Sequence, residues 1–125
     1  RLFRVNDSTA RGVPNLFARN ERVAALFDTE AGPMALILVG AIFVASIETV
    51  WHGVVTPPAA PGIRTWSYAD TPITLARGVE MGRFNMGSTI IVLFGPEAVE
   101  WNARLQPGAP MRMGEAMGRV VRAAR

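Results

Sequence analysis

The 125-residue sequence contains no cysteine, no lysine and one histidine, His52. Without cysteine, the chain cannot form a disulfide, a thiolate zinc site or a cysteine nucleophile. A catalytic zinc site usually takes three protein ligands with histidine prominent among them, and a hydrolase triad needs a histidine beside its nucleophile. One histidine is too few for such a zinc site, and no triad partners for it are evident. We therefore expect no metal site and no classical triad in this chain.

All thirteen basic residues are arginine. Pyridoxal phosphate is held by enzymes as a lysine Schiff base, and lipoyl and biotin groups are also carried on lysine. The chain can therefore carry none of these three cofactors. A genomic base composition that favours arginine codons would explain the absence of lysine equally well, and the exclusion holds in either case.

The charge balance is basic but modest, with a formal net charge of +3 and a pI of about 11.0. No long basic run occurs, and aromatic residues are not interleaved with basic ones as on a single-strand binding surface, so nucleic acid is not an expected partner. The densest basic cluster consists of Arg112, Arg119, Arg122 and Arg125. Its spacing is compatible with an anionic lipid surface and equally with an ordinary solvated terminus.

The composition, 50% hydrophobic and 18% charged, predicts one packed domain. The most apolar stretch, residues 34–47, is shorter than the roughly 20 residues that a membrane-spanning helix needs, and its Val, Ile and Phe content favours buried strands. No internal repeat and no second domain are evident. Because the chain opens at Arg1 without a methionine, we expect sequence upstream of it.

Turn residues divide the chain into short segments that favour extended structure. The segments expected to be extended are 21–28, 34–39, 41–51, 63–68, 78–84 and 89–94. The proline-rich stretch 54–62 should lie at a sheet edge or on the surface. This spacing predicts a mainly β fold, a single β-sandwich or barrel-like domain of short antiparallel strands with little helix. The best helix candidate, 115–124, is interrupted by Gly118.

The tetrapeptide Met86-Gly87-Ser88-Thr89 lies between two of these apolar segments. A Gly-Ser-Thr tripeptide is by itself typical of a turn. Here it resembles the Leu-Gly-Ser-Thr processing site of phosphatidylserine decarboxylases, with Met86 in place of leucine. Further stretches are similar to the bacterial members of that family, in the same order, and they cover residues 13–23, 27–30, 32–35, 39–41 and 46–51. The resemblance therefore spans nearly the whole chain.

The resemblance implies that residues 1–125 are the carboxy-terminal part of one catalytic domain that cuts itself between Gly87 and Ser88. The Ser88 hydroxyl would attack the Gly87 carbonyl and shift the acyl group from nitrogen to oxygen, a step that proximity accelerates. β-Elimination of the ester and hydrolysis with loss of ammonia would then leave a pyruvoyl group at the position of Ser88. Residues 1–87 would end the larger chain, and residues 88–125 would form the small pyruvoyl chain.

The same resemblance implies a lyase of phospholipid biosynthesis that is made as a zymogen. Its pyruvoyl carbonyl would form an imine with phosphatidylserine and accept the electrons released as CO2 leaves, giving phosphatidylethanolamine. The implied partners are the phosphatidylserine substrate and an anionic membrane surface, and the two self-cleavage fragments would associate with each other. The enzyme would lie peripherally at the cytoplasmic side of the cell membrane. A homo-oligomer stays open.

Ser88 is the one catalytic residue that the resemblance assigns to this chain. The family also uses an aspartate and a histidine, but both lie upstream of the matched segment and neither role passes to His52, which we expect on the surface or in a loop. Glu48 is either a functional carboxylate or a structural hydrogen-bonding partner. Arg83 or the terminal arginines could bind the lipid phosphate, and the spacing does not select among them. The tryptophans could lie at a lipid interface or pack internally; they are Trp51, Trp66 and Trp101.

Two other functions stay open at this point. The chain could belong to a related pyruvoyl decarboxylase that acts on another amino acid or on another serine lipid. It could also be a non-catalytic β-sandwich fragment that cannot process itself. Substrate assays separate the first alternative from phosphatidylserine decarboxylation, and an intact mass tests the second.

Overall fold

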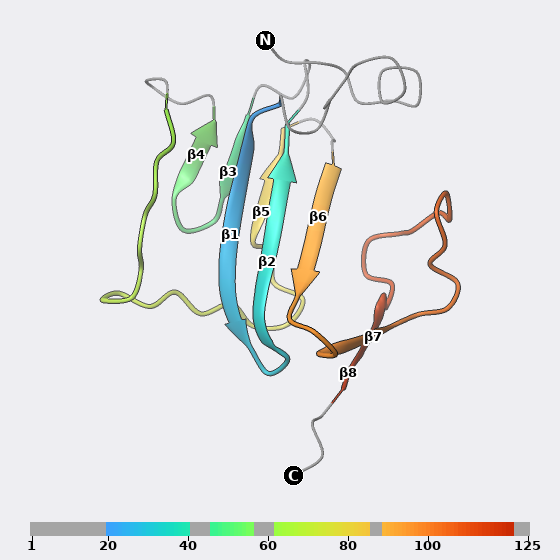
Figure 1. Ribbon diagram of the computed structural model, residues 1–125. Coiled ribbons are helices and arrows are strands. Elements are labelled where there is room, and N and C mark those ends of the chain that lie inside the picture. Colours follow the sequence, from blue (N-terminus) through green and yellow to red (C-terminus); the bar gives the residue numbers. More distant parts are fainter. Residues whose placement is uncertain (1–19, 41–45, 57–61, 86–88, 122–125) are drawn as a thin grey trace. The chain divides into compact units, whose positions relative to one another are not determined.

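The computed structural model describes residues 20–40, 46–56, 62–85 and 89–121, and these ranges contain eight strands and no helix (Figure 1). The strands are β1 (Arg22–Thr29), β2 (Gly32–Val39), β3 (Ile47–Thr49), β4 (Gly53–Thr56), β5 (Gly82–Phe84), β6 (Thr89–Phe94), β7 (Val99–Trp101) and β8 (Gly118–Val120). The prediction of a mainly β fold of short strands is therefore confirmed. Within these ranges nothing forms a helix that could cross a bilayer.

Contacts between Cα atoms divide the chain into two compact units. The first unit comprises Arg1–Val23 and Ile37–Ile90, and the second comprises Ala24–Leu36 and Ile91–Arg125. The sheet with strand order β4-β3-β5 belongs to the first unit. The second unit contains the two-stranded sheet β7-β8 and most residues of the three-stranded sheet β1-β2-β6.

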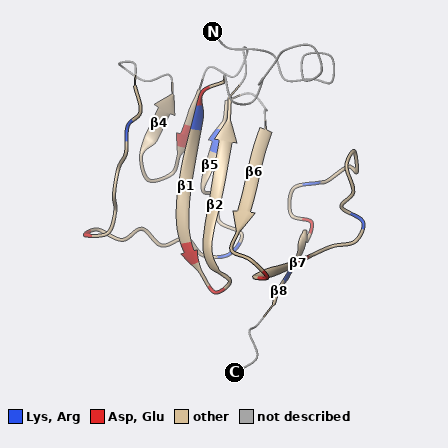
Figure 2. Cartoon of the chain, in the orientation of Figure 1, with Lys and Arg blue, Asp and Glu red and all other residues tan. Residues whose placement is uncertain are grey.

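In the sheet β1-β2-β6, the central strand β2 runs opposite to both neighbours (Figure 1). A two-residue turn joins β1 to β2, because Gly32 adopts a φ of 85° and the Thr29 hydroxyl donates to the Gly32 carbonyl at 2.7 Å. Neither β2 nor β6 carries a charged residue (Figure 2). Antiparallel sheets commonly have one solvated face, and Leu26, Ile90 and Leu93 of this sheet are more than half exposed among the described residues.

Most of the buried side chains among the described residues lie in the first unit. Ile47 in β3 and Val39 at the end of β2 are both 0% exposed, and Leu38 is 2% exposed. A register shift between Ile47 and Glu48 interrupts the pairing of β3 with β4. The Ile47 N–H instead donates to the Thr56 hydroxyl at 3.0 Å, so this buried backbone donor is satisfied.

Several expected strands match the structure, and several do not. The segment 89–94 is strand β6 with the expected bounds, and 21–28 corresponds to β1 shifted by one residue. Of 78–84 only Gly82–Phe84 is a strand, and residues 63–68 form none. In 41–51 the described strand is Ile47–Thr49, while residues 41–45 lie outside the described ranges.

The expected helix at 115–124 is wrong, because Gly118–Val120 is strand β8 paired with β7. A Cβ at position 118 would lie 2.3 Å from the Glu100 carbonyl oxygen, so Gly118 serves a close strand contact here. The first residues of the proline-rich stretch belong to β4, an edge strand of its sheet, as expected for that stretch. Residues 57–61 of the stretch lie outside the described ranges.

Candidate processing site

Strand β5 leads toward the Gly87-Ser88 dipeptide, and pairing with β3 fixes its position. The antiparallel pairs are Ile47 with Phe84, Glu48 with Arg83, and Thr49 with Gly82. The Asn85 N–H extends this pairing by donating to the Ser46 carbonyl at 3.2 Å. The chain is therefore held by backbone hydrogen bonds as far as Asn85, the last described residue before the dipeptide.

Gly82 allows β5 to approach β3 closely. A Cβ at this position would lie 2.4 Å from the carbonyl oxygen of Glu48 and 3.2 Å from the Cα of Thr49. Real Cβ atoms do not come this near to a backbone oxygen, so any other residue would push the two strands apart. The glycine therefore supports the course of the chain toward the candidate processing site.

Gly87 and Ser88, the residues expected to be cut and to form the cofactor, lie outside the described residues, as does Met86. The described chain resumes at Thr89, the first residue of β6. The dipeptide thus lies in the connection between β5, which pairs with β3, and β6, which pairs with β2. A break in this connection would remove no residue from either strand.

Residues from both sides of the Gly87-Ser88 bond share one sheet. Strands β1 and β2 precede the bond and β6 follows it, yet β6 is hydrogen-bonded to β2. Strands β7 and β8 lie wholly on the carboxy-terminal side of the bond. A cut at this bond would therefore leave two pieces joined by the hydrogen bonds between β2 and β6.

The guanidinium group of Arg83 is occupied by two carboxylates. It donates to Glu80 through two bonds of 2.8 and 3.0 Å, a bidentate arrangement that fixes the group in place. Its Nε also lies 3.7 Å from a carboxylate oxygen of Glu48, the residue directly opposite on β3. This contact favours the structural role for Glu48, and it gives Arg83 protein partners in place of a lipid phosphate.

Two buried threonines in the first unit differ in their hydrogen bonding. The Thr56 hydroxyl accepts from the Ile47 N–H, whereas the Thr49 hydroxyl has no partner within the described part of the chain. Thr49 is 3% exposed and pairs with Gly82 of β5. An unsatisfied buried hydroxyl costs about 1–3 kcal/mol, and nothing in the sequence around Thr49 indicates it.

His52 lies exposed in the turn between β3 and β4, which confirms the expected surface position. Its Nδ1 is 3.3 Å from the Tyr68 hydroxyl, and its ring centroid is 4.6 Å from that of Trp66. In the other unit, Trp101 packs against Phe94 with a centroid distance of 5.8 Å. Both tryptophans stay partly exposed, Trp66 at 45% and Trp101 at 47%, so each combines ring packing with solvent contact.

The carboxy-terminal basic cluster is partly neutralised by carboxylates. Arg119 donates to Glu100 at 2.6 Å, while Arg122 and Arg125 lie outside the described residues. Glu115 accepts from the Arg112 N–H at 3.2 Å and from the Arg104 side chain at 2.9 Å. The Arg112 N–H, and after it the Arg104 guanidinium, lower the pKa of Glu115 below its ordinary value of 4.5.

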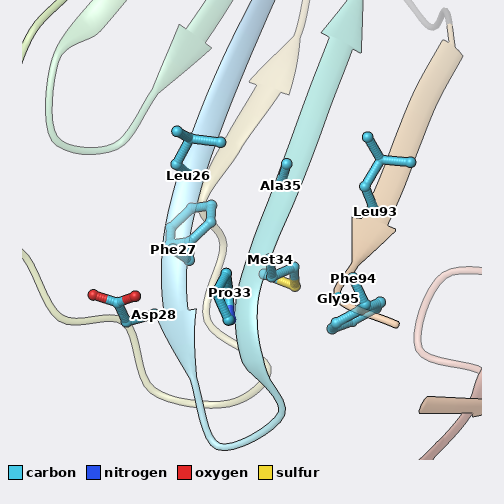
Figure 3. Close-up of a pocket in the computed structure, with 9 residues that line it drawn as sticks. All are labelled: Leu26, Phe27, Asp28, Pro33, Met34, Ala35, Leu93, Phe94 and Gly95. Atoms are coloured by element: carbon cyan, nitrogen blue, oxygen red, sulfur yellow. The ribbon is translucent and has the colours of Figure 1, made fainter. Parts of the chain in front are cut away.

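An open groove of about 440 Å³ lies on the sheet β1-β2-β6 (Figure 3). Leu26, Ala35 and Leu93 line it from three neighbouring strands, so residues before and after the Gly87-Ser88 bond contribute to it. Asp28 is its one charged residue. Apart from this carboxylate the groove is apolar and has no serine, threonine or cysteine, and the chemistry expected of this chain remains at Ser88.

The geometry describes a mainly β chain in which a glycine-serine dipeptide connects strands of two sheets. The family model for phosphatidylserine decarboxylase matches residues 1–119. Since this match covers most of the sequence, the chain belongs to the phosphatidylserine decarboxylase family.

Curated relatives agree with the family match. The phosphatidylserine decarboxylase proenzyme of Methylococcus capsulatus is 59% identical over 117 residues, which cover 94% of this chain and 41% of the relative. The proenzyme of Stutzerimonas stutzeri is 58% identical over 123 residues, covering 96% of this chain and 41% of the relative. The proenzyme of Pseudomonas fluorescens strain Pf-5 is 60% identical, covering 94% and 42%. The chain thus spans about two fifths of these relatives.

Proposed function

We propose that this chain is the carboxy-terminal part of a self-processing phosphatidylserine decarboxylase, which releases CO2 from phosphatidylserine to form phosphatidylethanolamine. The observation that carries the proposal is the match of residues 1–119 to the family, together with relatives of 58–60% identity that are named proenzymes. In this proposal the precursor is cut between Gly87 and Ser88. Ser88 is the source of a covalent pyruvoyl group.

The residues beside the dipeptide fit such a group. A carbonyl at position 88 would be attached directly to Thr89, and β6 begins at Thr89 and pairs with β2. Thr89 is thereby held in the sheet, so a reactive group bonded to it starts from a fixed point, and catalysis depends on such positioning. When present, the pyruvoyl group supplies an electron-withdrawing carbonyl for the decarboxylation. The chain's own contribution is to hold Thr89, the residue next to the group, by the β2-β6 pairing.

The shared sheet supports association of the two fragments after the cut. The fragment 1–87 would contribute β1 and β2, and the fragment 88–125 would contribute β6. Because strand pairing and apolar side chains hold β6, separation would expose backbone groups and apolar surface to water. We expect both fragments to copurify in native buffer and to separate in denaturant.

Peripheral binding at the cytoplasmic face of the cell membrane is the proposed location. The support is the arginine-only basic charge, with a net charge of +3, and the exposure of Trp66 and Trp101. The cytoplasmic leaflet carries anionic lipids that attract basic groups, and salt screens this attraction. Sedimentation with vesicles should show binding that requires anionic lipid and weakens as salt rises, and binding to neutral vesicles alone would contradict this location.

The decisive experiment is carried out on the full-length polypeptide. The unchanged sequence should yield two fragments that part between Gly87 and Ser88 by intact mass, whereas Ser88→Ala should remain one polypeptide. Ser67→Ala, at an exposed serine outside the dipeptide, should be cut normally. Cleavage of Ser88→Ala at the same bond would refute processing driven by Ser88.

A second measurement locates the reactive carbonyl. Borohydride added together with phosphatidylserine should attach the lipid to the first residue of the fragment 88–125 and abolish activity. Free serine in place of phosphatidylserine tests the alternative of an amino-acid decarboxylase. Labelling confined to the larger fragment, or activity that survives complete reduction, would overturn the assignment of Ser88.

A further inference from the structure

Two strand pairs in the chain have the same register and the same kinds of residues. In the first, β3 with β5, the pairs are Ile47-Phe84, Glu48-Arg83 and Thr49-Gly82. In the second, β7 with β8, the pairs are Val99-Val120, Glu100-Arg119 and Trp101-Gly118. Each therefore consists of an apolar pair, a glutamate-arginine pair and a pair that contains glycine. The expectation of no internal repeat is corrected by this finding.

The correspondence extends to the backbone on both sides of each pair. Met81 and Met117 precede the two glycines, and their carbonyls accept from Val50 at 2.9 Å and from Asn102 at 2.7 Å. At the opposite ends, the Ser46 carbonyl accepts at 3.2 Å and the Ala98 carbonyl at 3.0 Å. The hydrogen bonds that flank the two Met-Gly-Arg segments therefore join equivalent positions of the two strand pairs.

Both glycines also make the same close approach. A Cβ would lie 2.4 Å from the Glu48 carbonyl oxygen at Gly82, and 2.3 Å from the Glu100 carbonyl oxygen at Gly118. Such contacts admit only glycine. Because the two distances are nearly equal, the strands within each of the two pairs approach each other equally closely at this position. We therefore treat β7·β8 as a structural repeat of β3·β5.

The two pairs differ at the other edge of their first strand. Backbone groups of successive residues in an antiparallel strand point alternately to its two sides. In β3, Ile47 and Thr49 face the additional strand β4: the Ile47 N–H reaches Thr56, and Thr49 pairs with Gly53. By the same alternation, Val99 and Trp101 present their backbone groups on the edge of β7 opposite β8, where the described residues contain no further strand.

We propose that this open edge of β7 binds an extended segment of the full-length polypeptide from outside the 125 residues, as β4 binds β3. The relatives provide the material for such a segment, because this chain covers about two fifths of their length. An open strand edge presents unpaired N–H and C=O groups that can pair with another strand. The half-exposed Trp101 of β7, at 47%, would gain burial beside the added strand.

The inference rests on the repeat and on the length of the relatives, and it does not depend on pyruvoyl chemistry. It is therefore tested in full-length Ser88→Ala, where neither cleavage nor decarboxylation contributes. The measurement is hydrogen exchange of single backbone amides. Glu100 is the internal control, since its N–H faces β8 and should be protected by the β7·β8 pair alone.

An added strand should slow exchange at the Val99 and Trp101 amides to within about ten-fold of Glu100. If these two amides exchange about 100-fold faster than Glu100, the edge is open and the proposal fails. Absence of protection at all three positions would also overturn it, because the pair itself would then not form.

The identity of the occupant is tested separately. A photoreactive benzoylphenylalanine at position 101 should crosslink to a peptide of the same polypeptide outside the 125 residues. Protection that disappears on dilution would mean a second copy, and protection that appears only with anionic vesicles would mean a lipid surface. A crosslink to a peptide within residues 1–125, or either of these two outcomes, would overturn the proposed occupant.

Discussion

The strand pairs β3·β5 and β7·β8 have the same register and different surroundings. In β3, Ile47 and Thr49 are buried, and a third strand flanks the pair. In β8 every residue is exposed, and β7 has no second neighbour within the described ranges. The comparison separates two contributions: the glycine contact and the cross-strand pairs set the register, while burial determines how much stability the pair contributes.

The arginines of the two pairs differ less, because both are solvent-exposed, Arg83 at 55% and Arg119 at 76%. Arg83 is shared between Glu80 and Glu48, on the strand that leads to the candidate processing dipeptide. Arg119 has a shorter contact with Glu100, 2.6 Å, but their side chains are 76% and 59% exposed. Because exposed ion pairs contribute about 0–1 kcal/mol, neither arginine pair adds much stability, and the burial of β3 remains the main difference between the two strand pairs.

The largest effect is expected from Gly82→Ala. The added methyl group would meet the Glu48 carbonyl at 2.4 Å, and forced overpacking typically costs about 1–3 kcal/mol. The free energy of unfolding, from urea denaturation, should fall by about 2–3 kcal/mol. Gly118→Ala introduces the same clash in the exposed pair, and it should release β8 with a smaller loss of overall stability.

Gly95→Ala is the matched control, because a Cβ there meets no atom within 4 Å. It should leave the urea midpoint unchanged. Equal losses for Gly82→Ala and Gly118→Ala would contradict the idea that burial distinguishes the two strand pairs.

The buried threonines provide a smaller test within β4-β3-β5. Thr56→Val would leave the Ile47 N–H buried without its acceptor, which should lower the free energy of unfolding by about 1–2 kcal/mol. Thr49→Val removes a hydroxyl that has no partner within the described chain, and it should raise stability or leave it unchanged. Destabilisation of the full-length protein by Thr49→Val would show that the remaining polypeptide supplies a partner.

The sequence predicts those strands that have a local signal. β6 has the expected bounds because an apolar run begins at Thr89 and Gly95-Pro96 ends it. β7 and β8 escape prediction because three residues are too few for an alternating pattern to be recognised. Residues 63–68 contain β-favouring Ile63 and Trp66, yet a strand also needs a paired neighbour, which composition does not reveal.

For the candidate site, the assignment to Gly87 and Ser88 stays a prediction. Gly87 and Ser88 follow from the family resemblance, which rests on ordered stretches of sequence. The contact of Gly82 with Glu48 and the unpartnered Thr49 hydroxyl depend on pairing between segments far apart in the chain. Local sequence patterns carry no record of such pairing, so these supporting residues become visible only in the structure.

The smallest expected effect is the titration of Glu115, in the loop that joins β7 to β8. Its folded pKa lies below 4.5, chiefly because the Arg112 N–H donates to the carboxylate and secondly because Arg104 does. Because the carboxylate pKa is lower in the folded state, the ionised carboxylate stabilises the folded loop at pH values above its unfolded pKa. This contribution is lost as pH falls through the folded pKa. The Arg112 amide shift in an NMR titration should therefore show a step with its midpoint below pH 4.5.

Variants separate the two causes of this step. Glu115→Gln should abolish it, and Arg104→Gln should move the midpoint upward only in part, because the backbone donor from Arg112 remains. Since the carboxylate is solvent-exposed, neither variant should shift the urea midpoint as Gly82→Ala does. If Arg104→Gln alone returned the midpoint to 4.5, the side-chain ion pair would be the main cause. The lowered pKa of Glu115 would then come mainly from the solvent-screened charge of Arg104 and less from the backbone donor of Arg112.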